Sequence, residues 1–254
     1  MRASSPPSRR EPHNPAAADD GDEFRFCTTC AFSQACLSQG YAKPDLTAFQ
    51  ALIDHVGPFK PGEYIFREGD AFNAIAAVRG GTVKTFITDV AGNEQVLGFH
   101  LPGEVIGLNA IHPERYPCNA IALDTVTLCR FSFHQLSLLA ARVPNLQQQL
   151  FKLLSLDIGK ASLLVGDHSA DERLAAFMVL LSQRYAARGF SATRFTLTMA
   201  RADIANYLRL APETVSRILK RFRSERVIEV RQRDVQLLDP GRLEALARPV
   251  LRMI

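Results

Sequence analysis

Apolar and polar positions follow two different patterns along this chain. Between residues 57 and 133, short apolar runs such as EYIF, GTVKTFIT, EQVLGFHL and DTVTLCRFSF are separated by glycines. Short runs of this kind, with turn residues between them, are typical of a small antiparallel roll or barrel. We expect these glycines to serve turn geometry, because glycine tolerates positive φ and the usual phosphate-binding glycine motifs are absent from the sequence.

Helical spacing of apolar residues dominates the rest of the chain. It predicts a short amphipathic helix over 45–56 and a longer helix from Pro144 to about Gly166. The longer helix either carries a dimer seam or packs on its own roll, and periodicity alone leaves both open. Helical patterns return over 169–254, where IEVRQRDVQLLD also indicates two short strands around Gln232–Asp234.

The segment Arg201–Phe222 (RADIANYLRLAPETVSRILKRF) is the most informative stretch of the chain. Its apolar residues predict two short helices joined by a tight turn, with Pro212 beginning the second helix. The expected inner positions are Ile204, Ala205, Leu208, Val215, Ile218, Leu219 and Phe222. The polar residues expected on the second helix's outer face are Glu213, Thr214, Ser216, Arg217, Lys220 and Arg221. This arrangement is typical of a helix-turn-helix, whose second helix enters the DNA major groove.

Charge is distributed unevenly, with a basic C-terminal part. Residues 169–254 hold 16 Lys and Arg against 9 Asp and Glu, a net charge of +7, whereas residues 1–168 sum to −3. A basic segment binds DNA by neutralising phosphates and releasing counterions. A basic charge alone is equally consistent with a solvated helical face. The prediction of DNA binding therefore rests on the helix-turn-helix pattern.

Composition is that of a soluble intracellular protein. Hydrophobic residues make up 47% of the 254 residues, and no apolar run is long enough to predict a membrane span. Residues 1–23 are rich in Pro, Ala, Ser and charge, which predicts a disordered tail without a secretory signal. We therefore expect a cytoplasmic protein without membrane contact, in a compartment that keeps thiols reduced.

Three of the five cysteines lie close together before the predicted roll. They are Cys27, Cys30 and Cys36, and Cys118 and Cys129 follow inside the roll. Four thiolates suit either an iron–sulfur cluster or a structural zinc ion. A C-x-x-C pair also occurs in thiol oxidoreductases, but this pair does not lie at a βαβ turn, which disfavours that interpretation.

No motif in the sequence supports catalysis. The six histidines are scattered without the spacing of a catalytic zinc site, and no G-x-S-x-G motif supports a nucleophilic serine. The chain is therefore interpreted as a DNA-binding protein and not as an enzyme.

The sequence TMARADIANYLRLAPETVSRILKRF, followed by a wing, resembles the CRP/FNR family of bacterial transcription regulators, and its E-T-V-S-R core resembles the FNR subgroup. The resemblance extends through the roll, in FKPGEYIFREGD and VRGGTVKTFITDVAGNEQVLGFHLPGEVIGLNAI. One departure is Arg209, where helix-turn-helix turns often place glycine. Arginine is tolerable there if the residue is not forced to positive φ.

This resemblance implies an α+β fold with a cyclic-nucleotide-binding-like β-roll, a long dimerisation helix and a C-terminal winged helix-turn-helix. The expected domains are a tail at 1–23, a cysteine segment with the roll at 24–143, a dimerisation helix at 144–168 and a DNA-binding domain at 169–254. In the FNR subgroup, the residues that match Glu213, Ser216 and Arg217 read a TTGAT half-site of a palindrome.

The resemblance also implies two protein partners. The long helix is expected to form a homodimer through Leu150, Leu154, Ile158, Ala161 and Val165. The turn in TDVAGN resembles the loop by which family members touch RNA polymerase, which implies contacts by Thr88, Asp89, Gly92 and Asn93.

For the cysteines, the resemblance implies a [4Fe–4S] cluster that reports oxygen. The implied ligands are Cys27, Cys30, Cys36 and Cys129, because DTVTLCRFSF matches the strand that carries the family's fourth ligand. Cys118, in a proline-flanked loop, is the alternative fourth ligand if Cys129 does not serve. With the cluster intact, the dimer is expected to match two half-sites about 34 Å apart, and oxygen is expected to loosen the dimer.

Cyclic AMP is not expected as a ligand. The family's cyclic-nucleotide receptors hold the ribose with a Glu and the phosphate with an Arg-Ser pair, whereas Leu108 and the segment Tyr116–Asn119 stand at those positions here. A buried phosphate without a cationic partner is poorly compensated. Two alternatives stay open: a structural four-cysteine zinc site, and haem or another effector in the roll.

Overall fold

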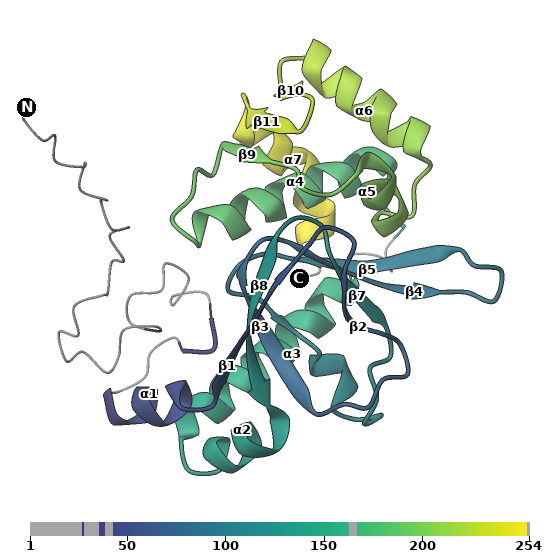
Figure 1. The fold of residues 1–254 in the computed structure, drawn as a ribbon. Helices are drawn as coiled ribbons and strands as arrows, with labels where there is room; N and C mark the ends of the chain where they lie inside the picture. Colours follow the sequence, from purple (N-terminus) through teal and green to yellow (C-terminus); the bar gives the residue numbers. More distant parts are fainter. Residues whose placement is uncertain (1–26, 28–35, 39–42, 163–166, 253–254) are drawn as a thin grey trace, which may run out of the picture.

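The computed structural model describes residues 27, 36–38, 43–162 and 167–252. A roll of strands occupies the middle of the molecule, and a helical unit with a small sheet packs on one side of it (Figure 1). The tail predicted at 1–23 lies outside the described residues. Among the described helices, none is both long and apolar enough to span a membrane.

Two four-stranded antiparallel sheets form the roll, which confirms the fold predicted from the glycine-punctuated apolar runs. The first sheet has the order β1 (Ile53–Phe59), β8 (Val126–Ser132), β3 (Ala74–Gly80) and β6 (Val105–Ile106). The second has the order β2 (Tyr64–Phe66), β7 (Asn119–Ala122), β4 (Val83–Thr88) and β5 (Glu94–His100). Buried apolar side chains such as Val78, Val83 and Leu128 fill the space between the sheets.

The helix predicted over 45–56 is wrong in its second half. Helix α1 (Lys43–Gln50) ends before β1 begins at Ile53. Ile53 and Val56 are β-branched, and β1 pairs along β8, so sheet formation overrides the helical spacing. The first half of the prediction holds, because Phe49 is buried and its ring centroid lies 4.9 Å from that of Phe131.

Two helices follow the roll and cover the outer face of the first sheet. They are α2 (Phe133–Ala140), which was not predicted, and α3 (Pro144–Ser162), which begins at Pro144 as expected. The predicted end of the long helix, near Gly166, lies outside the described residues. Leu136 of α2 and Leu146 of α3 are fully buried against Phe131 of the sheet.

The C-terminal unit combines helices with a three-stranded sheet. Its elements are α4 (Ala170–Ala186), β9 (Arg194–Thr196), α5 (Arg201–Tyr207), α6 (Pro212–Ser224), β10 (Ile228–Arg231), β11 (Asp234–Leu237) and α7 (Pro240–Leu251). The antiparallel pair β10–β11 is the wing predicted around residues 232–234, and β9 adds a third strand to it. Helix α7, which was not predicted, packs along α4.

A continuous hydrophobic cluster joins the roll to this C-terminal unit. Val96, Phe99 and Leu101, at and just after β5, belong to the same buried cluster as residues of α4, α5 and α6. The rings of Phe99, Phe177 and Tyr207 contact one another with centroids 5.5–6.3 Å apart. The two parts of the chain are therefore packed together through a shared core.

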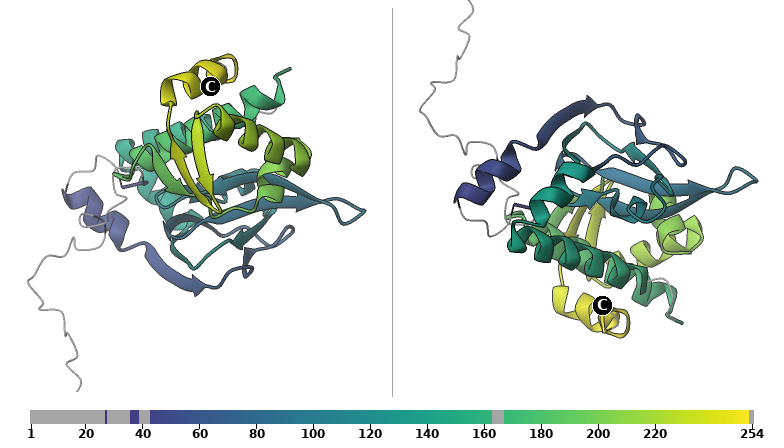
Figure 2. Two further views of the ribbon diagram at one scale, coloured as in Figure 1. Left: turned by 90° about the horizontal axis from the view of Figure 1, so that it is seen from above. Right: turned by 90° about the horizontal axis from the view of Figure 1, so that it is seen from below.

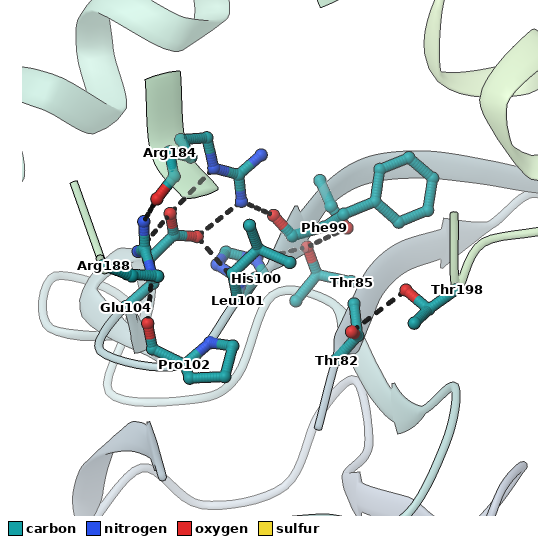
Figure 3. A network of polar contacts seen from close by, with 11 residues as sticks. Thr82, Thr85, Phe99, His100, Leu101, Pro102, Glu104, Arg184, Arg188 and Thr198 are labelled. Carbon is teal, nitrogen blue, oxygen red and sulfur yellow. Dashed lines mark hydrogen bonds and ion pairs between the residues drawn. The ribbon is translucent and has the colours of Figure 1, made fainter. Parts of the chain in front are cut away.

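A buried carboxylate adds a polar connection beside this core (Figure 3). Glu104 follows β5, and its Oε1 accepts hydrogen bonds of 2.8 Å from both Arg184 and Arg188 of the C-terminal unit. Its Oε2 accepts a second bond from Arg184 at 2.6 Å and the backbone N–H of Leu101 at 3.1 Å. Both guanidinium groups also donate to roll carbonyls, those of Phe99 and Pro102. One carboxylate thus holds two cations from the neighbouring unit.

The hairpin formed by β4 and β5 makes a second connection. Lys84 is buried, and its Nζ lies 2.8 Å from Glu94 and 3.0 Å from Asp203 of α5. Burial opposes the charged ammonium, but the two carboxylates outweigh it and raise the pKa of Lys84 above its usual value. Asn206 of α5 bonds the edge of β5 twice, accepting from the Val96 N–H at 2.8 Å and donating to the Glu94 carbonyl at 2.7 Å. Strand β5 is therefore fixed to α5 over Glu94–Val96.

Gly81 shows why a glycine is needed between β3 and β4. Its φ is +80°, and a Cβ added there would lie 2.3 Å from the carbonyl oxygen of Thr125. Gly92, at the hairpin tip, has a similar φ of +85° but open space around it. The first position needs glycine for space and for conformation, whereas the second needs it for conformation alone.

We predict that Gly81→Ala destabilises the protein more than Gly92→Ala does. Positive φ alone costs a non-glycine residue about 1–2 kcal/mol, so we expect Gly92→Ala to lower the free energy of unfolding by this amount. The backbone clash at Gly81 adds about 1–3 kcal/mol, as overpacking does elsewhere. Urea unfolding of the two variants at one protein concentration measures the difference, and equal losses would contradict the clash.

We further predict that Glu104→Gln destabilises the protein by about 3–5 kcal/mol, because it leaves the buried Arg188 guanidinium and the partly buried Arg184 guanidinium without their carboxylate. The control is Glu229→Gln, whose partner Arg231 has an 85% exposed side chain. An exposed pair of that kind contributes about 0–1 kcal/mol. Urea unfolding at fixed protein concentration compares the two, and a loss at Glu104 as small as that at Glu229 would refute the role of the buried network.

Candidate nucleic-acid interface and cysteine site

Helices α5 and α6 have the predicted helix-turn-helix arrangement. All seven residues expected on the inner faces are buried: Ile204, Ala205, Leu208, Val215, Ile218, Leu219 and Phe222. Helix α6 begins with Pro212 at its first turn, where a missing N–H costs no helical hydrogen bond. The inner face fixes the orientation of α6, so its opposite face points to solvent.

The outer face of α6 carries the predicted DNA-reading residues. Glu213, Ser216, Arg217 and Lys220 are exposed, whereas Thr214 is half-buried. Arg221 is exposed but forms an ion pair with Asp171 in the first turn of α4. A phosphate contact by Arg221 must therefore compete with Asp171, a partner that no local sequence signal indicated.

The turn between α5 and α6 requires an unusual conformation of Arg209. Its φ is +57°, in the left-handed region that favours glycine. The condition for tolerating arginine there, a negative φ, is thus not met. The turn is nevertheless closed by backbone hydrogen bonds from Arg209 N–H to Asn206 and from Leu210 N–H to Ala205, at 3.1 and 2.9 Å. The closed turn holds Arg209 in a conformation that is less favourable for arginine than for glycine.

Three of the four implied cluster ligands lie at one hydrophobic cluster. Cys27 is buried in the cluster on the outer face of the first sheet, and Cys36 and Cys129 are partly buried against it. The cluster also contains Leu37 and Phe49, and it is continuous with residues of α2 and α3. Cys30 lies outside the described residues. Thiols of the kind that bind iron–sulfur clusters and zinc thus lie at one largely apolar cluster.

The described cysteines are not arranged as a closed metal site. Among the described residues, no three Cys, His, Asp or Glu side chains lie close enough together to hold a metal ion. Cys118 lies apart from the cluster that holds the other three, and it accepts a hydrogen bond from Asn109 Nδ2 at 3.6 Å. Burial raises the pKa of the Cys118 thiol, which disfavours the thiolate form that binds metals.

Cys129 has a neighbour that sequence reasoning missed. His55 of β1 lies directly opposite Cys129 of β8 in the strand pairing, and its Nδ1 is 3.7 Å from the Cys129 sulfur. Burial, and then the neighbouring Arg79 guanidinium, hold the pKa of His55 below its usual value. Sequence reasoning set His55 aside with the other histidines because they show no metal-site spacing, and the pairing of β1 with β8 is what brings it beside Cys129.

The predicted dimer residues of α3 divide into two groups. Leu150 and Leu154 pack partly against the cluster that contains the cysteines. Ile158 is 73% exposed, and Phe151, which was not among the predicted residues, is 60% exposed. The side chain of Ala161 and the whole of Val165 lie outside the described part. The helix thus contacts its own roll and also presents large apolar side chains to solvent.

The predicted polymerase-contacting turn is the tip of the β4–β5 hairpin. Figures 1 and 2 show this hairpin extending beyond the rest of the molecule, on the side opposite α1. Asp89 closes the turn by accepting the backbone N–H groups of Ala91 and Asn93, at 2.9 and 2.8 Å. Hydrogen bonds from Asn93 hold the pKa of Asp89 below its usual value.

The interior of the roll holds a cavity of about 310 Å³. Tyr116 lines it, stacks on Phe66 with ring centroids 4.0 Å apart, and donates its hydroxyl to the Ala74 carbonyl at 2.6 Å. Arg130 also lines the cavity and pairs with Asp54. Leu108, at the position of the ribose-binding Glu, is buried in the other cluster, on the outer face of the sheet.

Comparison with known families gives two matches, one to the roll and one to the C-terminal unit. Residues 57–142 match the description "cyclic nucleotide-binding domain", and residues 172–246 match "Crp-like helix-turn-helix domain". The first range covers the roll and α2, and the second covers the helix-turn-helix and the wing.

Relatives align with most of the chain. The transcriptional activator protein Anr of Pseudomonas protegens is 42% identical over 224 residues, which cover 87% of this chain and 92% of Anr. The fumarate and nitrate reduction regulatory protein of Salmonella typhi is 38% identical over 224 residues, covering 87% and 90%. The solved structure of FixK2 from Bradyrhizobium japonicum matches with a TM-score of 0.69 at 26% identity, covering 76% of this chain and 96% of FixK2. The chain therefore belongs to the CRP/FNR family, whose members are DNA-binding transcription regulators and not enzymes.

Proposed function

We propose that this protein is an oxygen-responsive transcription regulator that binds a palindromic TTGAT-type site as a homodimer when a [4Fe–4S] cluster is intact. The proposed cluster ligands are Cys27, Cys30, Cys36 and Cys129. The observation that carries the proposal is that three of these residues meet at one hydrophobic cluster, which is shared with α3.

DNA recognition is supported by the chemistry of the exposed face of α6. Arg217 can donate two hydrogen bonds to guanine O6 and N7, and Glu213 can accept one from cytosine N4. Ser216 can bond either a base edge or the backbone. In a dimer, the two α6 helices must reach major grooves one turn apart, about 34 Å, which matches a palindromic site. Lys220 is proposed to contact phosphate.

The cysteine site supports an oxygen-responsive switch through its connection to α3. Cys27, Cys36 and Cys129 would hold a [4Fe–4S] cluster, which would supply an oxygen-labile link between the segment of Cys27 and Cys36 and strand β8. In this chain, Leu150 and Leu154 of α3 pack against the same apolar residues as these cysteines. Release of the cysteine segment therefore removes packing partners from the helix that is proposed to dimerise.

Loss of the dimer is sufficient to switch DNA binding. In a dimer, the second half-site is bound as an effectively intramolecular event, so separation of the protomers removes most of the affinity. The exposed Phe151 and Ile158 give α3 the apolar surface that such an association buries. We extend the proposed dimer surface to Phe151 on this ground.

Two further partner assignments belong to this proposal. Thr88, Asp89, Gly92 and Asn93 at the hairpin tip are proposed to contact RNA polymerase, since the tip projects from the molecule. Cyclic AMP is proposed not to be the effector, because the segment at the position that would hold its phosphate, Tyr116–Asn119, carries no Arg or Lys. Arg130, the guanidinium that lines the cavity, is paired with Asp54.

A structural zinc ion is the second candidate for the cysteine site, because four thiolates also suit tetrahedral zinc. In that case the protein remains a DNA-binding regulator, but its signal is not oxygen acting on a cluster. The metal and sulfide content of the purified protein separates the two candidates.

We predict that Arg217→Ala weakens binding to a TTGAT palindrome by about 1–3 kcal/mol and relaxes the preference for guanine at its position. Lys220→Ala should instead weaken all sequences about equally, because phosphate carries no sequence information. Arg252→Ala, an exposed change at the end of α7, is the control. Titrations of labelled duplexes at one salt concentration measure all three, and an unchanged sequence preference in Arg217→Ala would exclude the proposed role.

We predict that the protein purified without oxygen contains iron and sulfide in equal amounts, with visible absorption that bleaches in air. Cys129→Ser should abolish iron and sulfide retention, whereas Cys118→Ser should retain both, since Cys118 lies apart from the other cysteines. Colourless protein that contains zinc would replace the cluster with a structural metal. Loss of iron in Cys118→Ser with retention in Cys129→Ser would overturn the ligand assignment.

A further inference from the structure

We propose that His55 is a positioning residue for the cysteine site, and that its Nδ1–H donates a hydrogen bond to the Cys129 sulfur. The inference rests on the proposed function, because it takes Cys129 to be a cluster ligand. It assigns to His55 the task of orienting this sulfur and stabilising its thiolate.

The strand pairing brings the two side chains together. His55 and Cys129 are partners in the antiparallel pairing of β1 and β8, so their side chains leave the sheet on the same face. The Nδ1 to Sγ distance of 3.7 Å is within the range for a hydrogen bond to sulfur. The contact follows from the register of the two strands.

The register is held by the two pairs that precede His55 along β1. The next pair along the strands, Asp54 and Arg130, forms an ion pair on the opposite face of the sheet. The pair beyond it, Ile53 and Phe131, packs in the hydrophobic cluster on the same face as Cys129. A slip of one residue would turn both pairs to the wrong face, so the pairing of His55 with Cys129 is strongly specified.

His55 is well placed to act on Cys129 from the sheet. On its other side, Cys129 pairs with Ala77 of β3, whose methyl group offers no hydrogen bond. Of the two cross-strand neighbours, only His55 therefore carries a side-chain donor. His55 is exposed and Cys129 is half-buried, so the histidine stands at the solvent edge of the apolar cluster that holds Cys27 and Cys36.

Hydrogen bonds to ligand sulfurs are one of the means by which a protein sets the properties of an iron–sulfur centre. An N–H donor draws electron density from the thiolate, which raises the reduction potential of the centre. Outer partners of metal ligands also hold those ligands in orientation, and their loss typically costs about 10- to 100-fold in metal affinity. Both effects predict measurable changes when the donor of His55 is removed.

The test compares three variants of the full-length protein, purified without oxygen. His55→Ala removes the donor, and His55→Asn retains an N–H near the position of Nδ1. His134→Ala changes an exposed histidine on α2 and serves as the matched control. Each is measured by the reduction potential of the cluster and by the rate at which iron passes to an added chelator.

We expect His55→Ala to lower the reduction potential and to release iron about tenfold faster than the wild type. His55→Asn should restore both values, and His134→Ala should leave both unchanged. A wild-type potential and rate in His55→Ala would overturn the inference while leaving the cluster in place. If His55→Ala retains no cluster, the Asn variant decides the question. Retention of iron and sulfide by His55→Asn would support the hydrogen bond, whereas their loss from His55→Asn as well would overturn it. Wild-type protein without iron and sulfide would refute the proposed function and this inference together.

Discussion

The alternation of side chains along β8 is the constraint on which the roll and the cysteine site depend. Because successive residues of a strand face opposite sides of the sheet, Leu128 and Arg130 face the interior of the roll, while Cys129 and Phe131 face outward. Side chains of this one strand therefore line a cavity inside the roll and also pack in a hydrophobic cluster outside it. A residue at the proposed metal site and a residue lining the cavity are therefore adjacent in sequence but separated by the sheet.

The same alternation explains how the cysteine segment and α3 come to share a cluster. The outward residues of β1, β3, β6 and β8 present one apolar face, and the chain covers that face with α1, α2, α3 and the residues around Cys36. A packed protein interior contains few voids, so a shift of one side chain strains the side chains that it contacts. The physical connection between the cysteines and α3 is this shared contact surface, and it needs no continuous backbone path from Cys129 to the helix.

Sequence reasoning predicted those elements whose signals are local. The inner faces of α5 and α6 followed from helical spacing, and the strands of the roll followed from apolar runs between glycines. The region after Gln50 was predicted wrongly, because Ile53 and Val56 fit a helical stripe as well as a strand and only the partner strand β8 decides between them. The Glu104 network escaped prediction entirely, since its arginines lie 80 and 84 residues further along the chain. Sequence pattern indicated that Arg209 was unusual, but only the structure shows the positive φ that makes it so.

The anchoring of the β4–β5 hairpin has a consequence for how binding events at its two ends influence each other. Lys84 of β4 and Asn206 join the hairpin to α5, the first helix of the helix-turn-helix, while the tip extends beyond the body. The hairpin and the helix-turn-helix are therefore joined by direct contacts. Thermodynamic linkage is reciprocal, so a protein that grips the tip preferentially in the DNA-bound orientation must raise the affinity for DNA by the same factor by which DNA raises the affinity for that protein. Under the proposed polymerase contact, recruitment of that partner and retention on DNA would share a single coupling free energy.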